Sequence, residues 1–328
     1  MILNLERDIY FQKAYAALYA AVDSGAFADE FEYVIGNYSF KHIGIKRKIS
    51  EISGKAIQGN VFDMQTPYGY GGMLSNTGDT IFVSKAFEAY RAHCANEHIA
   101  AAFYTFHPFL PYFEEMKSQF NFLRKDREVV IVPLQASREE RWAGYASNTR
   151  NILRNCTKQL TYSLSEDLQA FKALYYQTME KNKATSFYYF DDAYFEGLLN
   201  LDDCSLVSVN YEGKAISMAF LFHSDVLGHY HLSANDSTYS KLNGNYFLLE
   251  ESIEFLKSKQ LNYFMLGGGR TNAEDDSLYK FKRKFSSMTL PYYIGGIIFD
   301  EEKYIELCNL WQVNNPSIGN NYFLKYRF

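Results

Sequence analysis

Two histidines are spaced so that both would lie on the same face of a β-strand, and either could take part in acid–base chemistry. His229 and His231 lie in the run HYHLSAN, whose composition and flanking turns predict a β-strand. Side chains two positions apart on a strand point to the same face, so both imidazoles are expected to share one. Histidine titrates near neutral pH, which makes either ring a candidate general base. His223 lies on the same predicted hairpin, but no cysteine or acidic cluster completes a metal site, so no metal is expected.

One lysine is distinctive in the segment 277–285, SLYKFKRKF. A helix here places Leu278, Phe281 and Phe285 on one apolar face. Lys282 is four residues after Leu278 and three before Phe285, on the flank of that face. A lysine in such a position must extend to solvent or meet an anion, so we expect Lys282 to reach a cleft and contribute to catalysis. Three basic neighbours point away from the apolar face: Lys280, Arg283 and Lys284.

The segment KLNGN, residues 241–245, could bind an anion. It precedes a helix predicted for residues 246–259, and the first turn of a helix presents free N–H groups and the positive end of the helix dipole. An ordinary helix start capped by asparagine explains the same segment equally well. Four residues would form a cofactor-binding site here: Lys241, Asn243, Gly244 and Asn245.

Three consecutive glycines, Gly267 to Gly269, follow the strand predicted for the run LNYFML. The glycines do not match GxGxxG, and no helix opens immediately after them, which excludes a dinucleotide-binding fingerprint. We interpret the run as a turn that lets Arg270 and the helix carrying Lys282 approach a cleft.

The loop TPYGYGG, residues 66–72, contains three glycines and a proline. This composition prevents regular structure and lets the backbone approach a ligand closely. Tyr68 and Tyr70 could line a polar cleft, since tyrosine pairs an apolar ring with a hydroxyl group. A surface turn explains the loop equally well.

A basic stripe follows at intervals of four residues on the helix predicted after Ser147. It consists of Arg150, Arg154 and Lys158. Such a stripe is usually the solvent-exposed face of a helix. Alternatively the stripe contacts phosphate groups, which arginine can bind through two hydrogen bonds at once. RNA binding through the stripe is a separate hypothesis, which predicts an affinity that falls steeply with salt.

Helices and strands must position these residues, and their order is similar in the two halves of the chain. Helix, strand, short helix and strand fill residues 79–134. The second half continues with a strand, helices, antiparallel strands, and then helix, strand, helix and strand. We therefore predict two similar α/β (α+β) domains, residues 1–147 and residues 148–328.

Composition limits the class of protein. The 328 residues are 47% hydrophobic and 22% charged, which predicts a globular protein with a sizeable core. The net charge of −5 gives no general attraction to nucleic acid or to anionic membranes. The four cysteines form no CxxC pair, the first residues lack a signal-peptide pattern, and no long apolar run occurs. A cytoplasmic protein without a membrane span is expected.

Seven segments resemble the Fem-type (FemAB-like) branch of the GNAT N-acyltransferase superfamily and occur in that family's order. They are TPYGYGGM at 66–73, FHPFLP at 106–111, TRNILRN at 149–155, HYHLSA at 229–234, LNGNYFLLEE at 242–251, LGGGR at 266–270 and SLYKFKRKFS at 277–286. The resemblance implies two tandem GNAT-like domains, each a mixed, largely antiparallel twisted sheet flanked by helices. It also implies transfer of an acyl or aminoacyl group to an amine, commonly that of a peptidoglycan precursor peptide or an amino sugar.

The resemblance divides the candidate residues between two substrates. Six are expected to bind the acceptor, a small-molecule or nucleotide-linked amine: Lys41, Tyr68, Tyr70, Arg150, Tyr230 and Arg270. The donor is expected at residues 241–245, with Lys282 serving it. The family's acetyl-CoA loop reads Arg/Gln-x-x-Gly-x-Gly/Ala, whereas here Lys241 heads the loop and the last small residue is missing. The expected donor is therefore acetyl-CoA or another acyl-CoA, and aminoacyl-tRNA is the alternative.

A function without catalysis is the main alternative. In this alternative one domain has lost its activity, as the altered donor loop would suggest. The protein would then be a binding module that recognises an envelope glycan or peptide precursor. Donor turnover in the presence of an amine acceptor would exclude this alternative.

Overall fold

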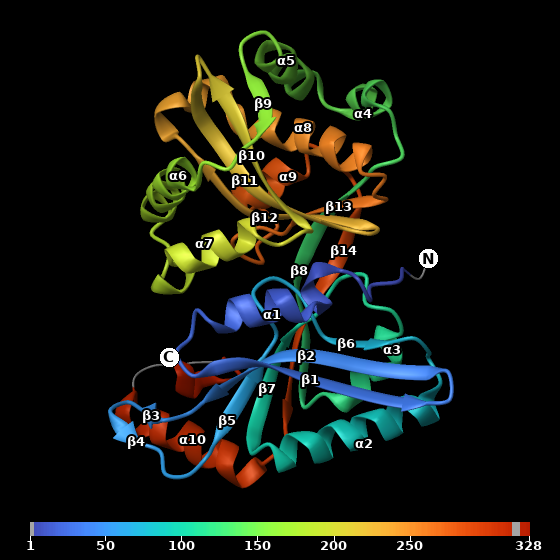
Figure 1. The fold of residues 1–328 in the computed structure, drawn as a ribbon, viewed down its shortest axis with the longest axis vertical. Coiled ribbons are helices and arrows are strands. Elements are labelled where there is room, and N and C mark those ends of the chain that lie inside the picture. Colours follow the sequence, from blue (N-terminus) through green and yellow to red (C-terminus); the bar gives the residue numbers. More distant parts are fainter. Residues whose placement is uncertain (1–2, 317–321) are drawn as a thin grey trace. The chain divides into compact units, whose positions relative to one another are not determined.

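The chain folds into two compact units, each assembled from separate parts of the sequence (Figure 1). The computed structural model describes residues 3–316 and 322–328. In both units a sheet packs against helices, so the predicted fold class is confirmed. The units consist of these ranges: residues 1–6, 10–126 and 292–328 for the first, and residues 7–9 and 127–291 for the second.

These units differ from the predicted division between residues 147 and 148. Residues 127–147 belong to the second unit, and residues 292–328 return to the first. The strand β8 (Phe122–Pro133) carries the chain out of the first unit, and β14 (Thr289–Ile298) carries it back. Strand pairing causes the difference, because β14 pairs with a strand almost 200 residues earlier, for which element order gives no signal.

The first unit has a mixed sheet in the order β1-β2-β5-β7-β14, in which only β5 and β7 are parallel. Alternate residues of β1 face different helices, since Phe31 packs on Tyr90 of α2 while Glu30 pairs with Lys13 of α1. Its other elements are α1 (Lys13–Ala20), β1 (Ala26–Ile35), β2 (Tyr38–Lys48), β3 (Glu51–Ile52), β4 (Lys55–Ala56), β5 (Phe62–Gln65), β6 (Met73–Ser75), α2 (Thr80–Asn96), β7 (Ile99–Thr105), α3 (Phe113–Met116), η2 (Lys117–Gln119), α10 (Glu301–Asn314) and η5 (Lys325–Arg327).

The second unit has a mixed sheet in the order β8-β13-β12-β11-β10-β9, in which only β12 and β13 are parallel. Successive residues of β11 face opposite sides: Phe220 packs on Phe171 of α6, and Leu221 joins the core under α8. The other elements are α4 (Arg138–Gly144), α5 (Ser147–Cys156), β9 (Thr161–Leu164), α6 (Leu168–Lys181), η3 (Ser186–Tyr188), α7 (Asp192–Leu199), β10 (Cys204–Tyr211), β11 (Lys214–Ser224), β12 (Leu227–Asn235), η4 (Ser237–Leu242), α8 (Gly244–Ser258), β13 (Tyr263–Gly267) and α9 (Ser277–Lys282).

Local sequence explains several element boundaries. The β10–β11 hairpin turns at Glu212 and Gly213, whose φ angles of 48° and 80° suit the tight turn that right-twisted strands prefer. Asp276 caps α9 by accepting from two of its N–H groups. The helix α5 begins at Ser147 itself, and its N-cap is Ala146, where no side chain makes a capping bond.

Candidate active site

The strands β12 and β13 of the second unit pair over only a short distance. Pairing with β13 covers Leu227 to His229, whereas pairing with β11 continues to Asn235. Beyond His229, β12 therefore has no strand partner on its β13 side among the residues that the structure describes. A bulge interrupts the β11 pairing at His231. An unpaired strand edge beside a bulge offers backbone N–H and C=O groups to an extended ligand.

Lys282 lies at the glycine run that follows β13. Its ammonium group is buried, with the residue 8% exposed, and donates to the carbonyl of Gly268 over 2.8 Å. Burial lowers the pKa of Lys282 to about 7; the Asp276 carboxylate opposes this shift and the Arg127 guanidinium adds to it. Near neutral pH the amine can therefore accept or give a proton. Of the four basic residues on this segment, Lys282 is the buried one and Lys280 is exposed, as the helix pattern predicted.

The glycine run itself is held by polar contacts at both sides. Arg127 donates to the carbonyl of Gly269 over 2.7 Å, and the Asp276 carboxylate accepts from the N–H groups of Arg270 and Thr271. A side chain at Gly269 would collide with Asp276, since a Cβ there would lie 2.4 Å from Oδ1. Glycine is thus required for close approach, whereas the exposed Arg270 side chain projects from the loop.

The two candidate base histidines have different surroundings. His229 Nε2 lies 2.6 Å from Oδ2 of Asp8, and both side chains are 1% exposed. His231 Nε2 lies 3.1 Å from the hydroxyl of Tyr194. Burial, followed by the neighbouring His229, holds the pKa of His231 well below its usual 6.5, so this ring stays neutral and is a weak base. The bulge at His231 also interrupts the strict alternation on which a shared strand face depends.

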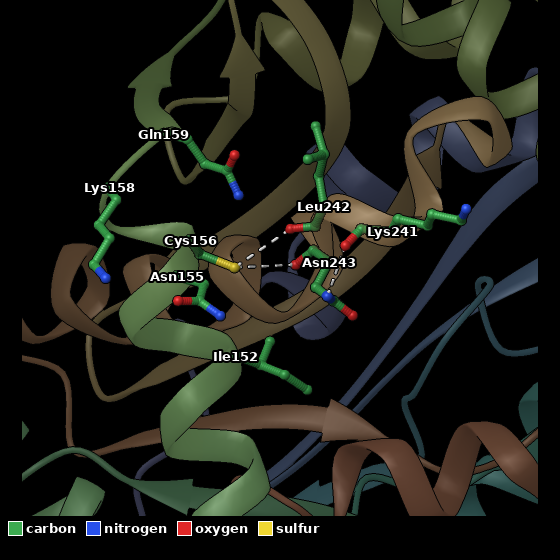
Figure 2. Close-up of a pocket in the computed structure, with 8 residues that line it drawn as sticks. All are labelled: Ile152, Asn155, Cys156, Lys158, Gln159, Lys241, Leu242 and Asn243. Atoms are coloured by element: carbon green, nitrogen blue, oxygen red, sulfur yellow. Dashed lines mark hydrogen bonds between the residues drawn. The ribbon is translucent and has the colours of Figure 1, made fainter.

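A pocket of about 340 Å³ opens at the start of α8 (Figure 2). Its walls come from the end of α5 and from the junction of η4 with α8: Ile152, Asn155, Cys156, Lys158, Gln159, Lys241, Leu242 and Asn243. Asn243 has φ 56° and ψ 38°, and its side chain makes no capping bond to the helix. The Asn243 side chain therefore leaves the first N–H groups of α8, which begins next to this pocket, without a side-chain cap.

Charge and hydrogen bonding make the pocket suited to an anion. Lys158 and Lys241 line it beside the positive end of the α8 dipole. In Figure 2 the Lys241 side chain extends away from Cys156, so Lys158 is the lysine on the α5 side of the pocket. The Cys156 thiol donates to the carbonyl of Leu242 over 3.4 Å, and burial raises the pKa of this thiol to about 11. Predicted residues Lys241 and Asn243 thus line a pocket, while Gly244 and Asn245 begin the adjacent helix.

Two predicted acceptor residues of the second unit have local partners. The Arg150 guanidinium donates to the carbonyls of Trp142 and Tyr145, which ties α5 to the end of α4. Arg150 thus stabilises the local fold and does not extend along an exposed stripe with Arg154 and Lys158. Tyr230 lies half-buried on β12 with its ring 6.3 Å from that of Phe264, and burial raises its pKa to about 12.

Three of the predicted acceptor residues belong to the first unit. Lys41 on β2 is 44% exposed and pairs with Glu32 over 3.2 Å. The carbonyl of Tyr68 accepts from the Tyr15 hydroxyl over 2.6 Å. The Tyr70 ring packs edge-on against three other rings of this unit, including His107 at 5.6 Å. The loop 66–72 is therefore a packed structure and not a loose surface turn.

His42 anchors the end of this loop. Its side chain is 1% exposed, and Nδ1 lies 3.0 Å from the carbonyl of Gly72. Burial lowers the pKa of His42 to about 4, so the neutral ring can donate from Nδ1 at physiological pH. Gly72 has φ 113° and no space for a side chain against Phe106, so its carbonyl direction is fixed. No local sequence signal links His42 to a loop thirty residues away, so only the structure reveals this contact.

Exchanging His42 for asparagine or leucine should separate the bond to Gly72 from the packing of the ring. The asparagine amide can replace the Nδ1 donor, whereas leucine removes it. We expect His42→Leu to raise amide hydrogen exchange in residues 66–72 by about tenfold, and His42→Asn to raise it much less. Hydrogen exchange with mass spectrometry measures this, and equal exchange in the two variants would contradict the anchoring role.

These features define a class of protein. Residues 145–283 match the family model described as an acetyltransferase (GNAT) domain, a range that contains the pocket, the unpaired edge of β12 and Lys282. This part of the chain is therefore similar to a GNAT acetyltransferase domain.

Solved structures with a similar fold cover most of the chain. The structure of FemX matches with a TM-score of 0.71 at 12% identity, covering 92% of this chain and 94% of FemX. The C-terminal domain of a putative lysylphosphatidylglycerol synthetase from Agrobacterium fabrum matches with a TM-score of 0.54 at 15% identity, covering 88% and 92%. L-PGS from Bacillus licheniformis matches with a TM-score of 0.52 at 12% identity, covering 86% and 87%. The chain therefore has the fold of FemX over 92% of its length, as expected for the Fem-type branch.

Neither a curated relative nor a membrane-spanning helix is found for this chain, the latter within the described residues. No curated protein matches this chain. Within residues 3–316 and 322–328, none of the helices combines the length and the apolar character needed to cross a membrane.

Proposed function

We propose that the protein is an N-acyltransferase that moves an acyl group from a coenzyme A thioester to an amine of a cell-envelope precursor, either an amino sugar or a peptidoglycan peptide. Such a reaction requires a bound donor, a base for the amine proton and stabilisation of an oxyanion. The observation that carries the proposal is that one GNAT domain contains the α8 pocket, the unpaired edge of β12 and the buried Lys282.

Support for coenzyme A comes from the start of α8. A helix of 15 residues begins at Gly244, and its N-terminus together with Lys158 forms a cationic site suited to a pyrophosphate. The unpaired part of β12 could bond the amide groups of a pantetheine arm as a strand would.

In the proposed reaction the acceptor nitrogen attacks the thioester carbonyl carbon, so that a C–N bond forms as the C–S bond breaks. The proton lost by the amine passes to neutral Lys282, and coenzyme A leaves as a thiolate that then takes up a proton. A pKa of about 7 lets Lys282 perform this transfer near neutral pH. His229 is the second candidate base, whereas the low pKa of His231 makes that ring less effective.

The acceptor is proposed from the family resemblance of the first unit. Lys41 is exposed enough to exchange its partner Glu32 for an acceptor phosphate, since a surface ion pair of this kind contributes little. Tyr68 and Tyr70 lie on a loop whose shape is fixed by packing, which favours binding without a cost of ordering.

An aminoacyl-tRNA is the second candidate donor. The similarity in fold to a protein named lysylphosphatidylglycerol synthetase favours it, because that name denotes an aminoacyl product. The two donors are distinguished by the group released, a free thiol or an uncharged tRNA.

A ligand screen followed by turnover tests the proposal. We expect coenzyme A at about 100 times its Kd to stabilise the protein by about 2.7 kcal/mol in a thermal unfolding assay. With acetyl-CoA and a nucleotide-linked amino sugar, a thiol reagent should then detect released coenzyme A. Stabilisation by charged tRNA alone would select the second donor. Binding without turnover of either donor would leave a non-catalytic module and overturn the proposal.

Reversing the charge of Lys158, in the turn that follows α5, tests the position of the donor site. Lys158→Glu places a negative charge in the pocket and should weaken coenzyme A binding by about tenfold or more. Arg154→Glu is the matched control, since Arg154 is exposed four residues earlier, near the end of α5, and does not line the pocket. Isothermal titration of both variants measures the effect. If the two variants lost equal affinity for coenzyme A, the ligand would be attracted by surface charge in general and not bound in this pocket.

A further inference from the structure

We infer that Tyr145 and Glu250 form a latch that positions helix α5, and with it one wall of the donor pocket. This inference rests on the proposed function, because it concerns the affinity for the donor. Neither residue touches the pocket, so both are positioning residues that act through α5.

Glu250 is a fully buried carboxylate with three side-chain donors. Its side chain is 0% exposed. Oε1 accepts from Nη2 of Arg141 and from Nε1 of Trp142, each over 2.9 Å, and Oε2 accepts from the Tyr145 hydroxyl over 2.9 Å. A buried carboxylate is tolerated only when such bonds replace its hydration. These donors lie more than 100 residues earlier in the chain, so Glu250 joins α8 to the segment that leads into α5.

Tyr145 is the member of this cluster that controls α5. It immediately precedes Ala146, the N-cap of α5, and its carbonyl accepts from the guanidinium of Arg150 on that helix. Burial and the Glu250 carboxylate raise the pKa of Tyr145 far above its usual value, so the hydroxyl stays a donor at all working pH values. The start of α5 is therefore fixed to α8 through one charge-assisted bond.

The opposite end of α5 has a weaker polar restraint. There the Cys156 thiol donates to the carbonyl of Leu242, and a thiol is a weak donor. Cys156 and Lys158 belong to the pocket wall that faces Leu242 and Asn243 (Figure 2). If the start of α5 is released, the far end has little polar bonding to keep this wall in place, and the pocket should widen.

The helix α4 is attached to α8 independently of Tyr145. Arg141 also bonds Glu254, and Arg138 bonds Glu251 over 2.9 Å. Loss of the Tyr145 hydroxyl should therefore leave α4 in place and release α5 alone. Loss of the Trp142 bond should affect the same carboxylate without releasing α5.

Two matched variants test the latch. Tyr145→Phe removes one hydroxyl that bonds Oε2, and Trp142→Phe removes one N–H that bonds Oε1 together with more ring volume. The first readout is the rate at which N-ethylmaleimide labels Cys156 in the folded protein, measured by mass spectrometry. The other cysteines, Cys94, Cys204 and Cys308, are buried and serve as internal references. The second readout is the Kd for coenzyme A.

We expect Tyr145→Phe to raise the labelling rate of Cys156 about fivefold or more and to weaken coenzyme A binding by a similar factor, with the other cysteines unchanged. Trp142→Phe should lower the melting temperature at least as much, yet leave both readouts within about twofold of wild type. Equal changes in the two variants, or no change in Cys156 labelling, would overturn the latch. The labelling needs no donor, so it decides this inference even if coenzyme A does not bind.

Discussion

Replacing Lys282 with methionine should lower turnover by about 10²- to 10⁴-fold, the range expected when a positioned proton-transfer group is lost. Methionine retains much of the side-chain volume but cannot accept a proton. The KM for the donor should change little, because the α8 pocket is formed by other residues. Steady-state kinetics on the two proteins measures this difference.

The pH dependence of turnover provides an independent test of Lys282. Only the uncharged amine can accept a proton, and its pKa is about 7, so kcat should rise with pH through about 7 and then level off. The residual activity of Lys282→Met should lack this rise. A wild-type profile that is flat from pH 6 to 8 would exclude Lys282 as the base.

Stability should respond to the same group in a predictable direction. In the unfolded chain the lysine pKa is near 10.5, so between about pH 7 and 10.5 the unfolded state holds a proton that the folded state has lost. The free energy of unfolding of the wild type should therefore rise with pH between about pH 7 and 10.5. Below about pH 7 the buried lysine is charged in the folded state, and the wild type carries the full destabilisation of that charge. Lys282→Met removes that cost, so its stability relative to wild type should be highest near pH 6 and fall towards pH 10.

Lys280→Met is the control for these measurements. Lys280 is exposed on the same short helix, two residues before Lys282. This variant should retain turnover and the pH profile of the wild type. If both variants lost activity equally, the loss would reflect damage to α9 and not removal of a proton-transfer group.

Replacing Arg327 with alanine should destabilise the first unit by about 3–5 kcal/mol, the cost typical of leaving a buried ion without its partner. The Asp63 carboxylate is 0% exposed and accepts from Nε and Nη2 of Arg327 over 2.7 and 2.9 Å. Arg327 also bonds the carbonyls of Arg47 and Lys48. Arg47 alone, with one bond to Asp63, would remain. Urea unfolding followed by tyrosine fluorescence or circular dichroism measures the loss.

The exposed pair of Lys303 and Glu306 on α10 provides a control for the Arg327 measurement. Lys303→Ala should change stability by no more than about 0.5 kcal/mol, because an exposed pair on one helix contributes little. A combined Arg327→Ala and Asp63→Ala variant should recover part of the loss, since it removes the unpaired charge together with its partner. A single Arg327→Ala variant as stable as Lys303→Ala would contradict the proposed importance of this buried pair.

The sequence predicted what depends on local periodicity. The apolar face of the segment 277–285 distinguished Lys282 from Lys280, and the structure buries the first and exposes the second. Asn243 and Gly244 marked the start of α8, which the structure places beside a pocket. Strand and helix order gave the fold class. In each case the signal spans a few turns or strand residues, so the chain itself contains it.

Tertiary structure decided everything that depends on distant partners. Asp8 beside His229, Arg127 at the glycine run and Glu250 beneath Tyr145 are contacts across about 100 to 220 residues, for which no local pattern exists. Arg150 was predicted to lie on an exposed basic stripe, whereas in the structure it donates to carbonyls of the preceding helix and turn.

For this protein the sequence determined which side chains have the right chemistry, since residue type and helical or strand period are local properties. The structure decided which of them are buried, which are paired and what their pKa values become. Lys282 illustrates the division: its position on a helix flank follows from the sequence, whereas its near-neutral pKa arises from burial, to which the nearby Arg127 adds. Burial and charge interactions act through space, and only the folded chain brings these groups together.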